Sequence, residues 1–271
     1  MIRKSATALT LIAALVAAPA FAGAVHDAAL FTGNTLAAND DGSTGNVNMG
    51  FNVNFFGQNF SSLFVNNNGN VTFDSASYTY TPFSLLSTST PMLAPFFADV
   101  DTRGAASGLV QYGQSTLDGH SVFGVNWLNV GYFPSASDKT NSFQLIITDR
   151  SDIAAGDFDF QFNYDNVEWE TGSASGGSNG LGGYSARAGW SNGVSSSYEL
   201  AGSAVNGSFI NGGGNALTAG SLNSNVLGQY NFQVRSGTVI SAVPEPETLA
   251  MLLAGLGLVG AIARRRRAQA A

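Results

Sequence analysis

Two aspartates, Asp99 and Asp101, are the residues best placed to do chemistry. They lie two positions apart in the apolar segment LAPFFADVDTR, and in an extended chain such residues point to the same side. Paired carboxylates are hard oxygen ligands of the kind that Ca²⁺ prefers. They could also act as a glycosidase pair if their carboxyl groups stood about 5 to 9 Å apart. The structural alternative is that one of them pairs with Arg103 or caps a turn.

Two further pairs alternate along the chain in the same way. Glu168 and Glu170 flank Trp169, a pattern typical of the polar face of a half-buried strand, although a retaining hydrolase would need such a pair in a cleft. Tyr78 and Tyr80 share one face of a Ser/Thr/Tyr-rich run. Their rings suit either stacking on sugars or packing on an edge strand.

The remaining reactive residue types argue against catalysis. His26 and His120 are too few and too isolated for a catalytic triad or a zinc site, and His26 lies in a segment expected to be a mobile arm. The chain has no cysteine, which excludes thiol catalysis. Because no nucleophile, base and orienting group can be assembled, we expect a protein that is not an enzyme and requires no cofactor, with Ca²⁺ as a candidate ligand.

The elements that must position these residues are strands. Apolar and polar residues alternate with period two, and no stretch of the domain repeats at 3.6 residues. Asn68-Gly69 predicts a type I′ turn between two short strands. Residues 172–183 read as a loop inside the domain, and residues 236–242 as a linker. We therefore expect an all-β chain with one antiparallel domain, a β-sandwich or barrel-like fold. The alternating segments are residues 51–55, 123–127, 143–147, 158–164 and 230–234.

The N-terminus has the form of a secretion signal. Arg3 and Lys4 precede the uncharged apolar run from Ala6 to Ala18, and Ala20-Phe21-Ala22 is an A-x-A cleavage site. This pattern predicts a signal peptide at residues 1–22, with cleavage between Ala22 and Gly23. The expected partners at this stage are the Sec machinery and signal peptidase.

The C-terminus predicts a short membrane anchor. Leu249 to Ala263 carries no charge and is followed by Arg264, Arg265, Arg266 and Arg267. A helix over 249–263 would measure about 22 Å against a hydrocarbon core of about 30 Å, and it can span if the arginines snorkel or the bilayer thins. The arginine cluster would stay in the cytoplasm. We expect transient insertion into the inner membrane.

Charge restricts the partners of the domain between these ends. The chain has 11 basic and 18 acidic residues, but six of the basic residues and two of the acidic ones lie in the terminal segments. The domain thus keeps 5 basic residues against 16 acidic ones, a net charge of −11. Such a surface argues against nucleic acid and anionic membranes as partners.

The tail resembles a PEP-CTERM sorting signal. Val243, Pro244, Glu245 and Pro246 form the motif, and an apolar helix and an arginine cluster follow it within residues 243–271. This resemblance implies a Gram-negative bacterium that makes extracellular polysaccharide. It also implies processing by an exosortase, a membrane-embedded cysteine transpeptidase.

The domain, residues 23–242, resembles the nidogen-like (NIDO) extracellular domain, most strongly over residues 48–236. The likeness rests on LFVNNNGNVTF, LAPFFADVDTR, VNWLNVGYF, NSFQLIITD, FNYDNVEWETG and AGW, which occur in the family's order. It implies adhesion or matrix assembly rather than catalysis.

Together these features predict an exported, non-enzymatic protein of the cell surface or extracellular matrix. Its expected role is adhesive, in cell–matrix adhesion or biofilm, with extracellular polysaccharide or surface proteins as partners. The alternative is a secreted carbohydrate-active enzyme or a Ca²⁺-dependent glycan-binding module on a β-sandwich.

Overall fold

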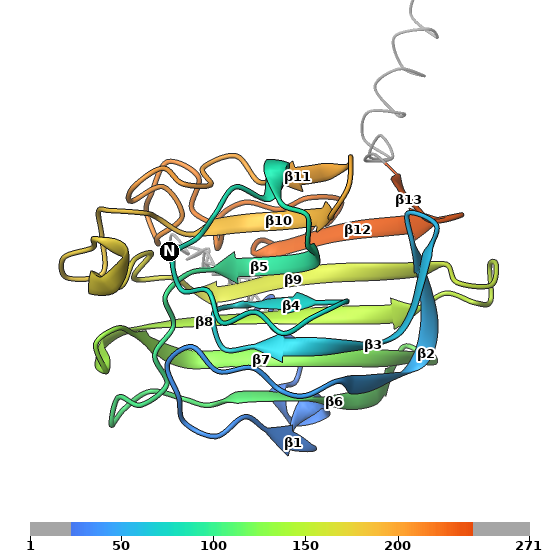
Figure 1. Ribbon diagram of the computed structural model, residues 1–271, viewed down its shortest axis with the longest axis horizontal. Helices are drawn as coiled ribbons and strands as arrows, with labels where there is room; N and C mark the ends of the chain where they lie inside the picture. The colour runs from blue at the N-terminus through green and yellow to red at the C-terminus, as the bar shows by residue number, and fades with distance from the viewer. Residues whose placement is uncertain (1–22, 241–271) are drawn as a thin grey trace, which may run out of the picture.

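Two antiparallel sheets lie face to face in the computed structural model, which describes residues 23–240 (Figure 1). The expected all-β sandwich is thereby confirmed. The larger sheet has the strand order β1-β6-β7-β8-β9-β12-β13, and the smaller one has the order β11-β10-β5-β4-β3-β2. The strands of the larger sheet are β1 (Asn34–Thr35), β6 (Val110–Leu117), β7 (His120–Tyr132), β8 (Ala136–Asp149), β9 (Phe158–Asn166), β12 (Gln229–Arg235) and β13 (Thr238–Ile240). The strands of the smaller sheet are β2 (Val47–Phe55), β3 (Gln58–Asn66), β4 (Asn70–Thr72), β5 (Pro91–Phe97), β10 (Arg187–Asn192) and β11 (Ser197–Glu199).

Three single-turn 3₁₀ helices complete the described elements: η1 (Ala28–Phe31), η2 (Leu85–Ser87) and η3 (Ser173–Ser175). Within residues 23–240 we find no helix with the length and apolar character needed to cross a membrane. The predicted tail helix at 249–263 lies outside the described residues, as do the signal peptide and the sorting motif.

The core forms where the alternating faces of the two sheets meet. Phe158, Phe160 and Phe162 of β9 are buried, and the polar residues between them face outward. The Phe160 ring stacks on Phe232 of the neighbouring strand with centroids 4.6 Å apart. From the other sheet, Phe96 packs against Phe143. Because buried aromatic rings contribute large apolar areas, these contacts hold the sandwich without disulfides.

The turn at Asn68-Gly69 differs from the prediction. Only Gly69 has a positive φ, +70°, and the Asn66–Asn70 pair closes a three-residue loop rather than a two-residue type I′ turn. The asparagines of this loop are buried and use their amides for structure, as described below. Two-residue turns with both φ values positive occur instead at 56–57, 118–119 and 236–237, each ending in glycine.

The last of these turns corrects the predicted linker. Ser236 and Gly237 connect β12 to β13, so residues 238–240 extend the larger sheet. The Ser236 amide donates to Asp157 Oδ1 over 2.8 Å. A chain that was expected to leave the domain here instead adds an edge strand.

The N-terminal segment is also docked rather than free. The His26 amide donates to Gln144 Oε1 at 3.1 Å, and the His26 ring lies 2.9 Å from Gln161 Oε1. Phe31 is fully buried against Val122 and Ile146 on the outer face of the larger sheet. The expected mobile arm is wrong for this stretch, because it covers apolar and amide groups that the sheet would otherwise expose.

Candidate functional site

The structure places Asp99 and Asp101 in two different environments. Asp101 accepts hydrogen bonds from Arg103 Nε at 2.8 Å, Arg103 Nη2 at 2.6 Å and the Ser135 amide at 2.7 Å. Burial by itself would raise the pKa of Asp101, but these hydrogen bonds with the Arg103 charge lower it. Asp101 is therefore ionised and anchors the segment between β5 and β6, with little of its carboxylate left for a ligand.

Asp99 instead joins two aspartates from a distant loop. Asp40 and Asp41 lie between β1 and β2, and each of the three residues offers a carboxylate oxygen within 4.8 Å of the others. We call Asp40, Asp41 and Asp99 the acidic cluster. Sequence reasoning missed its loop members, although the Asp-Asp-Gly run at 40–42 was visible and offers two adjacent carboxylates at a turn.

The buried loop from Asn66 to Asn70, which we call the asparagine loop, positions the acidic turn at residues 40–42. Asn67 donates through its side-chain amide to the carbonyl of Asp40, and the Asn67 backbone amide donates to Gly42 O at 2.8 Å. Asn68 Nδ2 donates to Asp41 Oδ1 at 2.8 Å. These contacts bring the asparagines of the β3–β4 connection directly against the carboxylates.

A second set of contacts joins the asparagine loop to the end of β5 and to the segment after it, which carries Asp99. Asn68 Oδ1 accepts from the Val100 amide at 2.8 Å, and the Gly69 carbonyl accepts from the Phe96 amide at 3.1 Å. A side chain at Gly69 would overlap the Phe96 carbonyl, so the close approach requires glycine. The asparagine loop thus holds the acidic turn and the end of β5 in one unit.

The cluster concentrates more negative charge than its surroundings neutralise. Burial, followed by the charges of Asp40, Asp41 and Asp101, raises the pKa of Asp99 to about 7. Burial and the neighbouring carboxylates raise the pKa of Asp40 to about 6, although Arg103 at 2.9 Å opposes the shift. Among residues 23–240, neither Asp41 nor Asp99 forms an ion pair with a lysine or arginine.

The carboxylates of Asp99 and Asp40 also receive few hydrogen bonds. Asp99 is almost completely buried, and the one hydrogen bond that its carboxylate accepts within residues 23–240 is a 3.5 Å contact from Ser175 Oγ. Asp40 Oδ1 is buried without a partner. Unpaired buried carboxylate oxygens are unfavourable unless protonated or bound to a cation. The three aspartates therefore fit a hard divalent cation such as Ca²⁺, whose remaining ligands would be carbonyl oxygens or water.

Exposed tyrosines lie beside the acidic cluster. Tyr78 and Tyr80 are 64% and 39% exposed and belong to an irregular segment between β4 and η2, not to an edge strand. Asn68 donates to the carbonyl of Thr79 at 3.2 Å, and Ser175 Oγ donates to that of Tyr80 at 3.4 Å. The same side chains that contact Asp41 and Asp99 thus hold the tyrosine segment.

The glutamate pair is not an exposed strand face. Glu170 is fully buried outside any strand and accepts from the amides of Gly207 and Phe209, each at 2.6 Å. Burial raises the pKa of Glu170, while these amides oppose the shift. Glu168 is exposed and accepts from the Thr140 amide at 2.9 Å. The expected exposed pair is therefore wrong for Glu170, which organises the loop that follows β11.

The two histidines occupy separate places. His26 lies on Gln161, and His120 Nδ1 lies 3.8 Å from Asp152. The remaining predicted site residues cannot be placed: Ala22, the motif at 243–246 and Arg264 to Arg267 lie outside the described residues.

Comparison with known proteins gives two family matches. Residues 61–236 match the nidogen-like domain, and residues 242–267 match the PEP-CTERM protein-sorting motif. Mouse alpha-tectorin is 33% identical over 178 residues, which cover 57% of this chain and 8% of that protein. Chicken alpha-tectorin is 32% identical over 191 residues, which cover 60% of this chain and 9% of that protein. Drosophila melanogaster nidogen is 32% identical over 119 residues, which cover 35% of this chain and 9% of that protein.

The chain thus spans less than a tenth of these relatives' lengths. No solved structure matches it. The domain and the motif together mark an extracellular surface protein with an exosortase sorting signal.

Proposed function

Because the chain belongs to the nidogen-like domain family, we propose that it is a non-enzymatic adhesion protein of the bacterial cell surface and matrix. The observation that carries the proposal is the combination of this domain with a sorting motif on one chain. Its tail would insert transiently in the inner membrane, and exosortase processing would release the domain to the surface. Its partner would be extracellular polysaccharide or another surface protein, in a biofilm or matrix.

The use of the carboxylates supports binding over hydrolysis. A glycosidase needs one carboxylic acid and one carboxylate facing each other across a substrate cleft. Asp101 is paired with Arg103, and Glu170 is bound by two backbone amides. Neither carboxylate is free to act as the acid or the base of a glycosidase.

The acidic cluster favours a second, narrower candidate function, a Ca²⁺-dependent glycan-binding module. A cation bound by Asp40, Asp41 and Asp99 would neutralise the cluster and fix the asparagine loop beneath the exposed Tyr78 and Tyr80. Aromatic rings held at a fixed surface bind sugars with little loss of conformational freedom. Calcium would thus act on the adhesive surface by ordering it.

The test uses the full chain exported from a host that carries an exosortase. Retention of the protein on films of extracellular polysaccharide is measured with Ca²⁺ and with EDTA, together with the release of reducing ends. Retention without release of reducing ends is expected, and stronger retention in Ca²⁺ would support the narrower function. Release of reducing ends in proportion to protein would establish an enzyme and overturn the proposal.

A further inference from the structure

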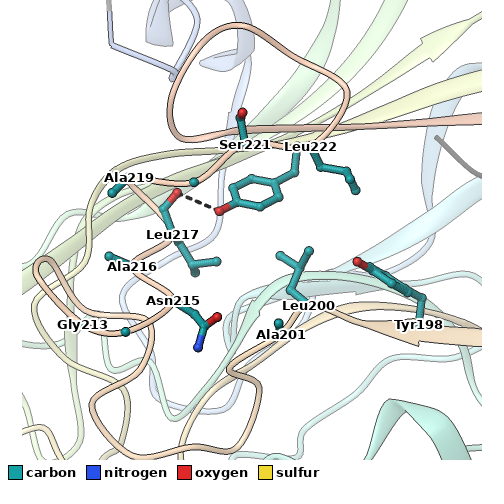
Figure 2. Close-up of a pocket in the computed structure, with 13 residues that line it drawn as sticks. Tyr198, Leu200, Ala201, Gly213, Asn215, Ala216, Leu217, Ala219, Ser221 and Leu222 are labelled. Carbon is teal, nitrogen blue, oxygen red and sulfur yellow. Dashed lines mark hydrogen bonds between the residues drawn. The ribbon is translucent and has the colours of Figure 1, made fainter. Parts of the chain in front are cut away.

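A pocket of about 400 Å³ lies between the edge strand β11 and the loop that precedes β12 (Figure 2). Its volume falls within the range of about 300 to 1,000 Å³ that is usual for small-molecule sites. Tyr198 and Leu200 form one side, and Asn215, Ala216 and Leu217 face them in Figure 2. No member of the acidic cluster lines it, so the pocket is a separate feature.

The lining combines an apolar floor with a polar rim. Leu200, Ala216, Leu217 and Tyr230 are at most 7% exposed and supply the floor. At the rim, Tyr198 is 37% exposed, and Asn215 and Ser221 are also exposed.

The rim groups have hydrogen-bonding capacity to spare. The Tyr198 hydroxyl and Ser221 Oγ form no side-chain hydrogen bond with other residues of the 23–240 domain. Asn215 Nδ2 donates to Ser208 Oγ at 2.9 Å, which leaves its Oδ1 available. The Tyr198 ring is held in place by stacking on Trp190, with centroids 6.4 Å apart. A ligand would therefore meet a fixed aromatic ring, two hydroxyls and an amide oxygen.

Internal hydrogen bonds hold the pocket in shape. The Tyr230 hydroxyl donates to Leu217 O at 3.2 Å, drawn in Figure 2, and the Gly228 amide donates to Gly220 O at 2.7 Å. The Leu217 amide donates to Phe209 O at 3.2 Å, and the Phe209 amide in turn is bound by Glu170. A wall fixed in this way loses little conformational freedom when a ligand binds.

Charge decides which class of ligand suits the pocket. Among residues 23–240, no aspartate, glutamate, lysine, arginine or histidine lines the pocket, so an ionic ligand would find no counter-charge there. The net charge of −11 on residues 23–240 also repels anions. A neutral molecule with both apolar C–H faces and hydroxyl groups matches the floor and the rim together.

We propose that this pocket binds a neutral hexose unit of an extracellular polysaccharide, an inference that rests on the proposed adhesive function. The C–H face of the sugar lies over Leu200 and the Tyr198 ring. Its hydroxyl groups bond to the Tyr198 hydroxyl, Ser221 Oγ and Asn215 Oδ1. The pocket thus supplies recognition without any residue placed for bond cleavage.

The test is saturation-transfer NMR and calorimetry on the full chain. The probes are methyl glycosides of glucose, galactose and mannose, their neutral oligosaccharides, glucuronate as the charged comparison, and an apolar strand-forming peptide as the protein-like comparison. We expect binding of at least one neutral saccharide, and a loss of about tenfold or more in affinity in Tyr198→Ala and in Ser221→Ala. Tyr184→Ala, which removes a tyrosine that is 65% exposed outside the pocket, serves as the matched control and should bind as wild type.

Several results would overturn the inference. The first is that glucuronate or the peptide binds and no neutral saccharide does. The second is that none of the probes binds. The third is that wild type and both pocket variants bind a neutral saccharide with equal affinity. If Tyr198→Ala unfolds early, Ser221→Ala at the exposed rim decides. Retention on polysaccharide films that no neutral saccharide competes with would remove the pocket inference and leave the adhesive function standing. Absence of retention on every film would instead remove polysaccharide as the partner in the proposed adhesive function.

Discussion

The acidic cluster and the neutral pocket differ in their charge, although irregular segments contribute to both. In the cluster, one buried and two half-buried carboxylates lie close together with one arginine beside them. In the pocket, a wall of small residues and tyrosines leaves open space without any charge. Carboxylates brought together away from water favour a cation, whereas a pocket with an apolar floor and a polar rim favours a neutral ligand.

Removal of the Glu170 carboxylate should have the largest effect and should act on the pocket. Glu170→Ala leaves the amides of Gly207 and Phe209 without their acceptor, which costs about 1 to 3 kcal/mol for each amide. Urea unfolding measures the loss of stability, and saccharide affinity should fall with it. Glu168→Ala, at an exposed carboxylate with one backbone contact, should cost less than about 1.5 kcal/mol. Equal effects of the two variants would contradict the assigned role of Glu170.

The acidic cluster should give stability an unusual dependence on pH. The pKa values of Asp99 and Asp40 are raised to about 7 and about 6, so between about pH 4 and pH 7 the folded state binds more protons than the unfolded state. Stability contributed by these groups therefore falls as pH rises through this range. Melting temperatures in EDTA should show that fall, and Asp99→Asn should flatten it. A wild-type profile that rises across the whole range would show that the cluster does not dominate.

A matched pair of glycines separates the two features. A methyl group at Gly172 would overlap the Asp99 carboxylate, and one at Gly220 would overlap the Tyr230 hydroxyl. Gly172→Ala should therefore weaken Ca²⁺ binding and spare saccharide binding, and Gly220→Ala should do the reverse. Calorimetry with each ligand on both variants measures this. Loss of both ligands in both variants would mean that the two features are one coupled site.

The smallest effect is expected at the exposed tyrosines. Tyr78→Ala removes a ring that is 64% exposed, so stability should change by no more than about 0.5 kcal/mol. Retention on polysaccharide films should nevertheless fall if the tyrosine segment contributes to adhesion. Retention equal to wild type would restrict adhesion to other surfaces.

The strands could be predicted from the sequence, but the partners of the acidic residues could not. Alternation fixes which side of β9 is buried, because each residue's face depends on its neighbours alone. Whether Asp99 or Asp101 belongs to the acidic cluster depends on a loop that is distant in sequence, because only folding brings Asp40 and Asp41 close to Asp99. Asparagines 66 to 68 looked like turn residues, yet burial makes them the connectors of the cluster. The pocket wall at 213–222 has no periodicity that would predict its shape.

Calorimetric titration of the full chain with Ca²⁺ at pH 8 tests whether the acidic cluster binds a divalent cation. We predict one ion bound per chain, loss of that binding in Asp99→Asn, and normal binding in Asp74→Asn, which alters an exposed aspartate outside the cluster. No heat of binding in wild type, or the same heat in wild type and Asp99→Asn, would show that the acidic cluster does not bind Ca²⁺.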